Sequence, residues 1–423
     1  MINKLILKNT ILLTMANVIN KAALFILTIF IARYLREAGF GQYSLVVTIT
    51  GFFLLLTNYG LGTTAFREIS KDVSQAGKYV TNILFIRTCL GVISFLLLVV
   101  TIRILSYSPE IALACYVYGI TILSTNFIEL FTSLFNAYEK MEYAALLMVI
   151  LNVLTLGFGI AAVRYGLVPL MVSSVFAGIF AVIIGFKLAT RMVRLDISCL
   201  DKDFIVTLLR ESTPIMLIGF LGIIYFRVDI VLLSKLKTSA DVGIYNAAYK
   251  LMDSFMIVST AIIGATFPHI SRYSKLPAKQ YGRIFAKLSY VMFGLGTLIS
   301  LVTFYYADGI VKLMFGSGYQ ESVQVLKIVI WTVPFIYINA VLLYTLIGFN
   351  QQKRLVPLVF IVTLTNLLLN IIYIPRYGYW GASVVTLGCE IIMFTGYYYL
   401  IRKHLSLSLL RNPVTLKPLR MEQ

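Results

Sequence analysis

Long apolar stretches, separated by short charged segments, follow one another along the whole chain. They are apolar on every face, so no helical or strand period stands out and their length is the informative feature. Because a helix needs about 20 mostly apolar residues to cross a bilayer core of ~30 Å, each stretch predicts one membrane-spanning helix. By this criterion about twelve spans are expected, over residues 9–32, 43–66, 80–104, 111–136, 143–163, 167–189, 212–234, 244–267, 285–307, 323–348, 355–374 and 380–401.

The composition is that of a protein whose solvent is lipid. Hydrophobic residues make up 59% of the 423 positions and charged residues 13%, and the mean hydropathy is +0.89. Soluble domains average about 45–50% apolar and about 25% charged residues, so a chain this apolar would lack a surface that water can solvate. The fold class expected is therefore all-α and integral to the membrane.

The excess of basic residues predicts an orientation. A net charge of +18 would suggest a nucleic-acid partner in a soluble protein. In a membrane protein, Lys and Arg instead concentrate in cytoplasmic loops, where they also meet anionic lipids. Loops on the side of the termini carry about 23 of them and the opposite loops about nine. We therefore expect a multi-pass protein of the cytoplasmic membrane with both termini in the cytoplasm, anionic lipids as partners, and no nucleic acid.

Signatures of catalysis are missing from the sequence. It contains no GxxxxGK[ST], HExxH or GxSxG, and its four cysteines form no CxxC pair. The loops opposite the termini are too short to present paired carboxylates for acid–base or metal chemistry. We expect no enzymatic activity, no catalytic residue, no metal site and no cofactor, with Na⁺ or H⁺ as candidate coupling ions.

The chain is predicted to form two lobes joined by a linker. The N-terminal six-helix lobe covers 1–195, the linker 196–211, the C-terminal six-helix lobe 212–402, and a basic cytoplasmic tail 403–423. In the linker, Phe204, Ile205, Leu208 and Leu209 share one helical face between charged residues, which favours a short helix on the membrane surface. The alternative is that this segment extends the seventh span.

An internal repeat supports the two lobes. Residues at the end of the first span recur about 202 positions later: Arg33 matches Lys235, Gly41 matches Gly243, and Tyr43 matches Tyr245. At a nearby offset, Arg164-Tyr165-Gly166 recurs as Arg376-Tyr377-Gly378. Six spans per lobe give both lobes the same orientation, an arrangement that transporters use to rock around a site between them. A duplicated bundle without motion is the alternative.

Three segments carry a resemblance to a known family: RYLREAGFGQYSL (33–45), NYGLGTTAFREISKD (58–72) and FRVDIVLLSKLKTSADVGIYNAAYKLMD (226–253). They resemble segments of polysaccharide transporters, the O-antigen type flippases of the multidrug/oligosaccharidyl-lipid/polysaccharide exporter superfamily. The resemblance implies a V-shaped pair of six-helix lobes, alternating access, and a polyprenyl-diphosphate-linked oligosaccharide as cargo for cell-surface polysaccharide biosynthesis.

Ionisable residues at bilayer depth are functional candidates because each costs about 3 kcal/mol or more there. We assign Lys21, Arg227, Arg87 and Lys250 to a cationic cavity that would neutralise the diphosphate, and Glu390, Glu129, Asp229 and Asp253 as candidate coupling-ion or proton sites. Asn58, Tyr59 and Asn126 could bond sugar hydroxyls or serve only in helix packing.

The sequence also offers structural explanations for these charges. Asp229 and Lys250 are equidistant from the turn between two spans, which predicts an ion pair and leaves Arg227 with a spare charge. Lys21, with no partner on its own helix, would face a wet cavity or pair with Glu390. Glu129 could equally bond a neighbouring helix, and Arg87 could reach the membrane surface.

Two other functions compete with the flippase. A cation-coupled multidrug exporter of the same superfamily would need acidic residues deep in the first lobe, where Lys21 has the opposite sign. A membrane-embedded glycosyltransferase or polymerase would need larger loops with carboxylates. We expect a monomer that cooperates with other polysaccharide-assembly proteins.

Overall fold

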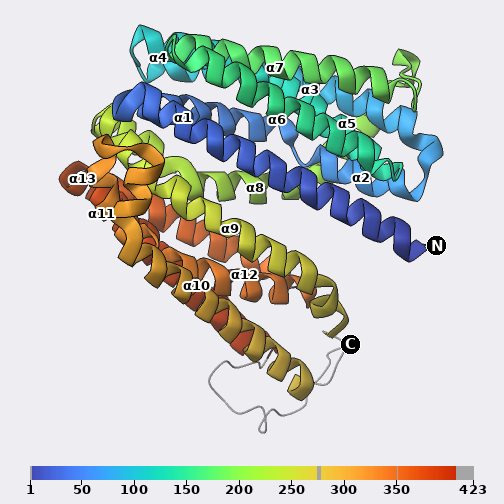
Figure 1. The fold of residues 1–423 in the computed structure, drawn as a ribbon. Helices are drawn as coiled ribbons and strands as arrows, with labels where there is room; N and C mark the ends of the chain where they lie inside the picture. The colour runs from blue at the N-terminus through green and yellow to red at the C-terminus, as the bar shows by residue number, and fades with distance from the viewer. Residues whose placement is uncertain (1, 274–277, 350, 406–423) are drawn as a thin grey trace. The chain divides into compact units, whose positions relative to one another are not determined.

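The computed structural model describes residues 2–273, 278–349 and 351–405, and the regular elements in those ranges are helical, which confirms the all-α fold class. Most of the predicted basic tail, residues 406–423, lies outside the described residues. The α-helices, shown in Figure 1, are α1 (Ile2–Asn58), α2 (Leu61–Lys71), α3 (Ala76–Ile104), α4 (Pro109–Gly119), α5 (Thr121–Ala137), α6 (Met141–Val163), α7 (Leu167–Ala189), α8 (Lys202–Leu236), α9 (Ser239–Tyr273), α10 (Ala278–Phe315), α11 (Gln320–Val329), α12 (Thr332–Gly348) and α13 (Gln352–Leu405).

The length and apolarity of these helices identify a multi-pass membrane protein. Within the described ranges, eight helical segments are long and apolar enough to cross a bilayer, and nine if the bent pair α11 and α12 counts as one. Two of them contain a break, α1 at Arg36 (φ 56°) and α13 at Gly378 (φ 56°), so each holds two rods. Counting these breaks adds a rod to each of the two helices, and the number of passes in each half stays a prediction.

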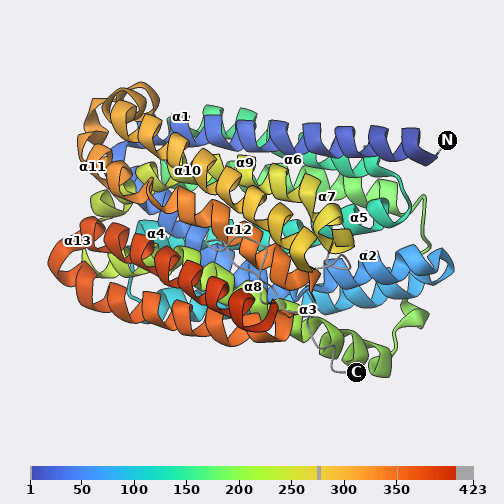
Figure 2. The same ribbon diagram turned by 90° about the horizontal axis from the view of Figure 1, so that it is seen from below.

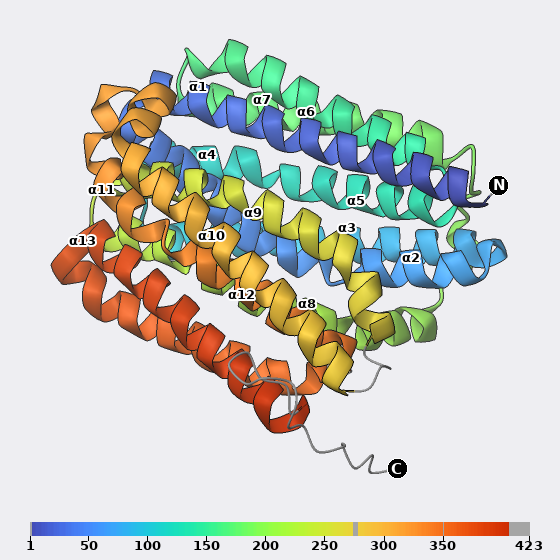
Figure 3. The same ribbon diagram turned by 60° about the horizontal axis from the view of Figure 1, so that its bottom comes forward.

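The chain divides into two compact units, Met1–Ile223 and Ile224–Gln423, and the boundary falls inside α8. In the first unit, α6 packs against α1 and α7, and α5 packs against α2, α3 and α7. In the second unit, α12 packs against α9, α10 and α13. The two arms of α13 lie side by side (Figures 2 and 3), and Gly381 permits this, because a methyl group there would lie 2.8 Å from the carbonyl oxygen of Tyr373.

The predicted linker belongs to the first unit. Its apolar residues Phe204, Ile205, Leu208 and Leu209 form the first turns of α8 and pack on the core of that unit. The Phe204 ring contacts the Tyr79 ring at 4.9 Å, edge to face. The amphipathic face is therefore buried against protein within a helix that continues into the next span, which is the alternative that the sequence left open.

The repeat coincides with equivalent corners of the two units. The first copy surrounds the break at Arg36, and the second surrounds the turn between α8 and α9 at 236–239. Gly166 (φ 104°) joins α6 to α7, and Gly378 joins the arms of α13. A positive φ is accessible to glycine at little cost, which explains why these last two corners place glycine at the turn.

Candidate functional site

A polar cavity of about 550 Å³ lies inside the first unit, a size within the roughly 300–1,000 Å³ range of ligand pockets. Its lining includes Glu129, three asparagines and many hydroxyl groups: Asn20, Asn58, Asn152, Tyr43, Tyr118, Thr63, Thr121, Thr125, Thr132, Thr155, Ser124, Ser133 and Ser174. Polar residues of α5 recur three or four positions apart, so they share one face of that helix. The sequence thus gives one helix a hydroxyl-rich stripe inside an apolar bundle.

The Arg87–Glu129 ion pair and the Asn58 amide lie together at this cavity. The Arg87 side chain is fully buried, and its Nη2 lies 3.8 Å from Oε2 of Glu129, whose side chain is 39% exposed. Asn58 donates through Nδ2 to the same carboxylate oxygen. The Glu129 carboxylate therefore lies between the buried Arg87 guanidinium and the cavity. The positive charge of Arg87 partly neutralises the negative charge that Glu129 presents to the cavity.

Neighbouring groups fix the guanidinium in place. Arg87 Nη1 donates to the backbone carbonyl of Asn126, whose amide in turn donates to Thr57 Oγ1. Gly62 allows the close approach of α2, because a methyl group there would lie 3.2 Å from Arg87 Nη2 and 3.1 Å from Ser133 Oγ. Asn20 also lines the cavity, and its buried Oδ1 has no hydrogen-bond partner within the described residues.

The predicted site residues of the first unit have different surroundings. Lys21 is exposed, forms no ion pair with a described residue, and follows the cavity-lining Asn20 on α1. The prediction that Arg87 contacts substrate is wrong for this structure, because its guanidinium is enclosed by protein. Asn126 is likewise fully buried with its amide engaged, and the Tyr59 hydroxyl lies 3.1 Å from Thr213 Oγ1. Of the three predicted glycan contacts, Asn58 lines the cavity.

The second unit corrects the predicted ion pairs. Arg227 pairs with Asp253 through Nη2 and Oδ2 at 2.9 Å, and its guanidinium lies 5.4 Å from the Tyr249 ring centroid. Asp229 accepts from the Tyr245 hydroxyl and from the backbone N–H of Ile230 at 2.8 Å. The predicted Asp229–Lys250 pair is therefore wrong: a tyrosine hydroxyl satisfies Asp229, and Arg227 is not spare.

Glu390 is the other buried carboxylate of this unit, with 4% of its surface exposed. It accepts from the Tyr225 hydroxyl at 2.8 Å and from Asn339 Nδ2 at 2.9 Å. Neutral donors thus satisfy both Asp229 and Glu390. Sequence reasoning, which looked for opposite charges, missed these partners, although Tyr245 stands in a repeated motif. In the described ranges no three His, Cys, Asp or Glu side chains gather as a metal site.

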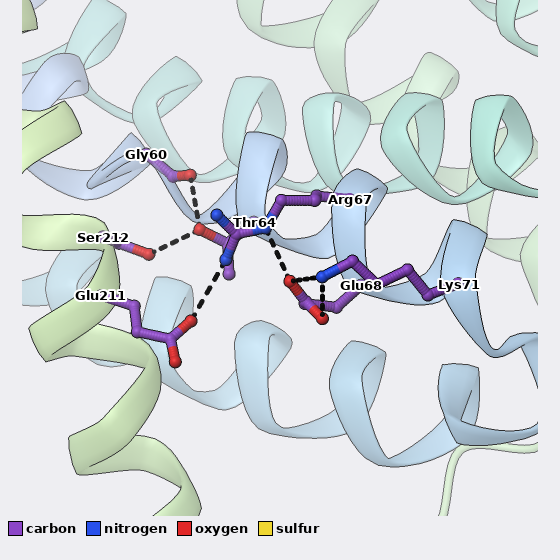
Figure 4. Close-up of polar contacts among 7 residues, drawn as sticks. All are labelled: Gly60, Thr64, Arg67, Glu68, Lys71, Glu211 and Ser212. Atoms are coloured by element: carbon purple, nitrogen blue, oxygen red, sulfur yellow. Dashed lines mark hydrogen bonds and ion pairs between the residues drawn. The ribbon is translucent and has the colours of Figure 1, made fainter. Parts of the chain in front are cut away.

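The motif segment 58–72 holds helix α8 through side-chain contacts, which Figure 4 shows. It forms α2, whose Thr64 hydroxyl lies 2.9 Å from Ser212 Oγ on α8. Arg67 donates to Glu68 and, at 3.3 Å, to Glu211. These contacts tie the start of α8, the helix that leads into the second unit, to the first unit.

Comparisons with known proteins agree with this architecture. The model of the family described as "Polysaccharide biosynthesis protein" matches residues 6–274, and the MatE model matches residues 214–372. The "Probable low-salt glycan biosynthesis flippase Agl15" of Haloferax volcanii is 23% identical, over 90% of this chain and 80% of its own. The "Putative O-antigen transporter" of Shigella dysenteriae is 25% identical, over 91% of this chain and 97% of its own.

Solved transporters share the fold. The lipid II flippase MurJ in an inward closed conformation superposes with a TM-score of 0.75 at 14% identity, covering 93% of this chain and 87% of its own. An inward-facing multidrug resistance MATE family transporter gives a TM-score of 0.68 at 12% identity, covering 88% and 93%. These likenesses establish an all-α membrane transporter fold. Because the first family model covers more than half of its length, the chain belongs to the polysaccharide biosynthesis protein family.

Proposed function

We propose that this chain is a flippase that moves a polyprenyl-diphosphate-linked oligosaccharide across the cytoplasmic membrane by alternating access, for cell-surface polysaccharide biosynthesis. Family membership and relatives named as flippases and O-antigen transporters support the cargo class. The observation that carries the proposal is the polar cavity of the first unit. Several of these side chains, such as Thr132, Ser133 and Asn152, donate to carbonyls of their own helix, which leaves their oxygens as acceptors for the hydroxyl groups of a sugar.

In this proposal, lysine residues bind the diphosphate and buried carboxylates bind the coupling ion. Lys21, which is exposed and follows the lining residue Asn20 in the sequence, meets the diphosphate, which would otherwise cross the bilayer without a counter-charge. Lys250 is a second candidate, because no described residue forms an ion pair with it. Asp229 and Glu390, buried carboxylates held by neutral donors, are candidates for Na⁺ or H⁺ coupling.

The topology is also part of the proposal. The excess of basic residues in the loops on the side of the termini supports a cytoplasmic position for both termini, and an even number of passes requires that both lie on one side. The chain would act as a monomer beside other proteins of polysaccharide assembly.

The decisive experiment is lipid extraction from a strain that lacks this protein. Carrier-linked oligosaccharide should accumulate on the cytoplasmic leaflet and disappear when the wild-type gene is restored. A Lys21→Ala variant should reach the membrane at the normal level yet leave the accumulation in place. Unchanged carrier lipids in the deletion strain would refute the flippase, whereas normal export by Lys21→Ala would refute only the role of that residue. Collapsing the ion gradient should slow export if transport is coupled.

A cation-coupled multidrug exporter is the second candidate, because one observation favours it. The cavity lining contains a glutamate but neither lysine nor arginine, and the MatE model matches part of the chain. A cationic dye loaded into proteoliposomes distinguishes the two functions. Dye efflux that depends on a Na⁺ or H⁺ gradient and is lost in Glu129→Gln would support the exporter, and its absence would leave the flippase.

A further inference from the structure

A second pocket, of about 550 Å³, lies at one corner of the second unit, where the α8–α9 turn meets the break in α13. Lys237 and Asp241 line it from the turn, and the run Arg376-Tyr377-Gly378-Tyr379-Trp380 lines it from α13. Because the corner joins the ends of four helical rods, it stands at the depth where a membrane-spanning bundle meets the lipid headgroups.

The pocket has an excess of positive charge. Its single carboxylate, Asp241 Oδ2, accepts from the Thr238 backbone N–H at 2.9 Å and from the Thr238 hydroxyl at 2.6 Å, so it caps the start of α9. Neither Lys237 nor Arg376 forms an ion pair with a residue that the structure describes. Nearby Glu321 accepts from the Tyr379 hydroxyl and is not among the lining residues.

The backbone and the aromatic residues shape the pocket for a headgroup. The positive φ of Gly378 turns the chain there, and a methyl group at this position would lie 3.7 Å from Cε of Lys237. Tyr377 and Trp380 remain 57% and 40% exposed on either side of the turn. Tyrosine and tryptophan concentrate at the level of lipid headgroups, where their rings meet the apolar boundary and their polar atoms meet water.

The first unit repeats the arrangement at its own corner. Arg164 donates through Nε to the Ala161 carbonyl at 3.2 Å, and its guanidinium lies 5.6 Å from the Tyr165 ring centroid. Ala161 and Tyr165 also line an apolar groove of about 450 Å³ between α6 and α7. Arg164 contacts two residues that line this apolar groove, Ala161 and Tyr165, and a cation next to an apolar groove is the complement of an anionic lipid, which joins a negative headgroup to a hydrocarbon chain.

We propose that the corner pocket formed by Lys237 and Arg376 binds the phosphate headgroup of an anionic membrane phospholipid, with Tyr377 and Trp380 flanking it. The site is separate from the cavity of the first unit, and the proposal does not rest on transport. Each basic residue near an anionic membrane surface should raise lipid affinity about five-fold, so the pocket should prefer an anionic over a zwitterionic lipid by up to about 25-fold.

Tryptophan fluorescence tests this directly, because the chain has two tryptophans and one lines the pocket. A Trp331→Phe variant of the full chain keeps Trp380 as the reporter. In vesicles that contain brominated lipid, bromine quenches the emission of a tryptophan that it contacts. Brominated phosphatidylglycerol should quench Trp380 at a much lower mole fraction than brominated phosphatidylcholine. Equal quenching by the two lipids would overturn the proposal.

Variants and salt sharpen the test. Lys237→Gln and Arg376→Gln should each lower the preference about five-fold, and the double variant should abolish it. Lys312→Gln, which removes an exposed lysine near the end of α10 in the same unit, should leave it unchanged. Without any pocket substitution, added salt should weaken the preference. A preference that survives in the double variant, or that ignores salt, contradicts the site. Release of the lipid by millimolar inorganic phosphate would also contradict it, because the pocket would then bind the free ion.

Discussion

Replacing Glu129 with glutamine should cost more stability than replacing Arg87 with methionine, although both changes break the same ion pair. The Arg87 side chain is 0% exposed, whereas that of Glu129 is 39% exposed to the cavity. Glu129→Gln leaves a buried charge without its counter-ion, which costs about 3 kcal/mol or more. Arg87→Met leaves a carboxylate that still has Asn58 and the cavity, so we expect a loss of about 1–2 kcal/mol.

A double-mutant cycle measures this asymmetry. Two unit charges 3.8 Å apart attract by about 4 kcal/mol at an effective dielectric constant near 20. Because solvent in the cavity screens Glu129, we expect a coupling energy of about 1–2 kcal/mol between the two residues. The double variant should therefore lose about 1–2 kcal/mol less than the sum of the two single losses. Reversible unfolding in mixed micelles, titrated with dodecyl sulfate, gives the free energies. Arg103→Met and Glu142→Gln, both exposed, serve as matched controls with changes within about 0.5 kcal/mol. Additive losses from the two buried substitutions would refute the pairing.

Three further predictions, made with four substitutions, test other parts of the structure. Arg227→Met and Asp253→Asn should show a coupling of about 1 kcal/mol or more in the same assay, and additive losses would contradict their ion pair. Thr64→Val should cost about 1 kcal/mol, because it removes a buried hydroxyl that bonds the start of α8; an unchanged free energy of unfolding would argue against that bond. The backbone N–H of Phe204 and the Lys78 ammonium hold the pKa of Asp201 below its usual value. A lowered folded-state pKa stabilises the protein above pH ~4 and the effect fades as pH falls through it, so the stability difference between wild type and Asp201→Asn should shrink in acid; a difference independent of pH would contradict this.

The length and apolarity of the stretches allowed the fold class to be predicted, because few backbone structures are stable across a bilayer. Backbone groups in hydrocarbon must be satisfied within each segment, so long apolar stretches become helices. The repeat of glycine and tyrosine positions marked the equivalent corners that the structure shows at Arg36, Gly166 and Gly378. Both features are local or periodic, and they can be read without knowing which helices meet.

The candidate site could be predicted only in part. The sequence pointed to Glu129 and Asn58, which do line the cavity, because an acidic residue in an apolar span is conspicuous. It assigned Arg87 to the substrate, whereas the fold encloses that side chain behind Glu129. Asn82, Arg87 and Ser94 mark the buried face of α3, but the sequence does not show whether that face meets the cavity or another helix.

The sequence by itself determined that the chain crosses a membrane several times as helices, since the hydrophobic effect and backbone hydrogen bonding act on each segment separately. The tertiary structure alone decided which charges are neutralised and by what. Asp229 meets the Tyr245 hydroxyl and Arg227 meets Asp253 because helix rotation and packing, set by many small contacts at once, choose which side chains face each other.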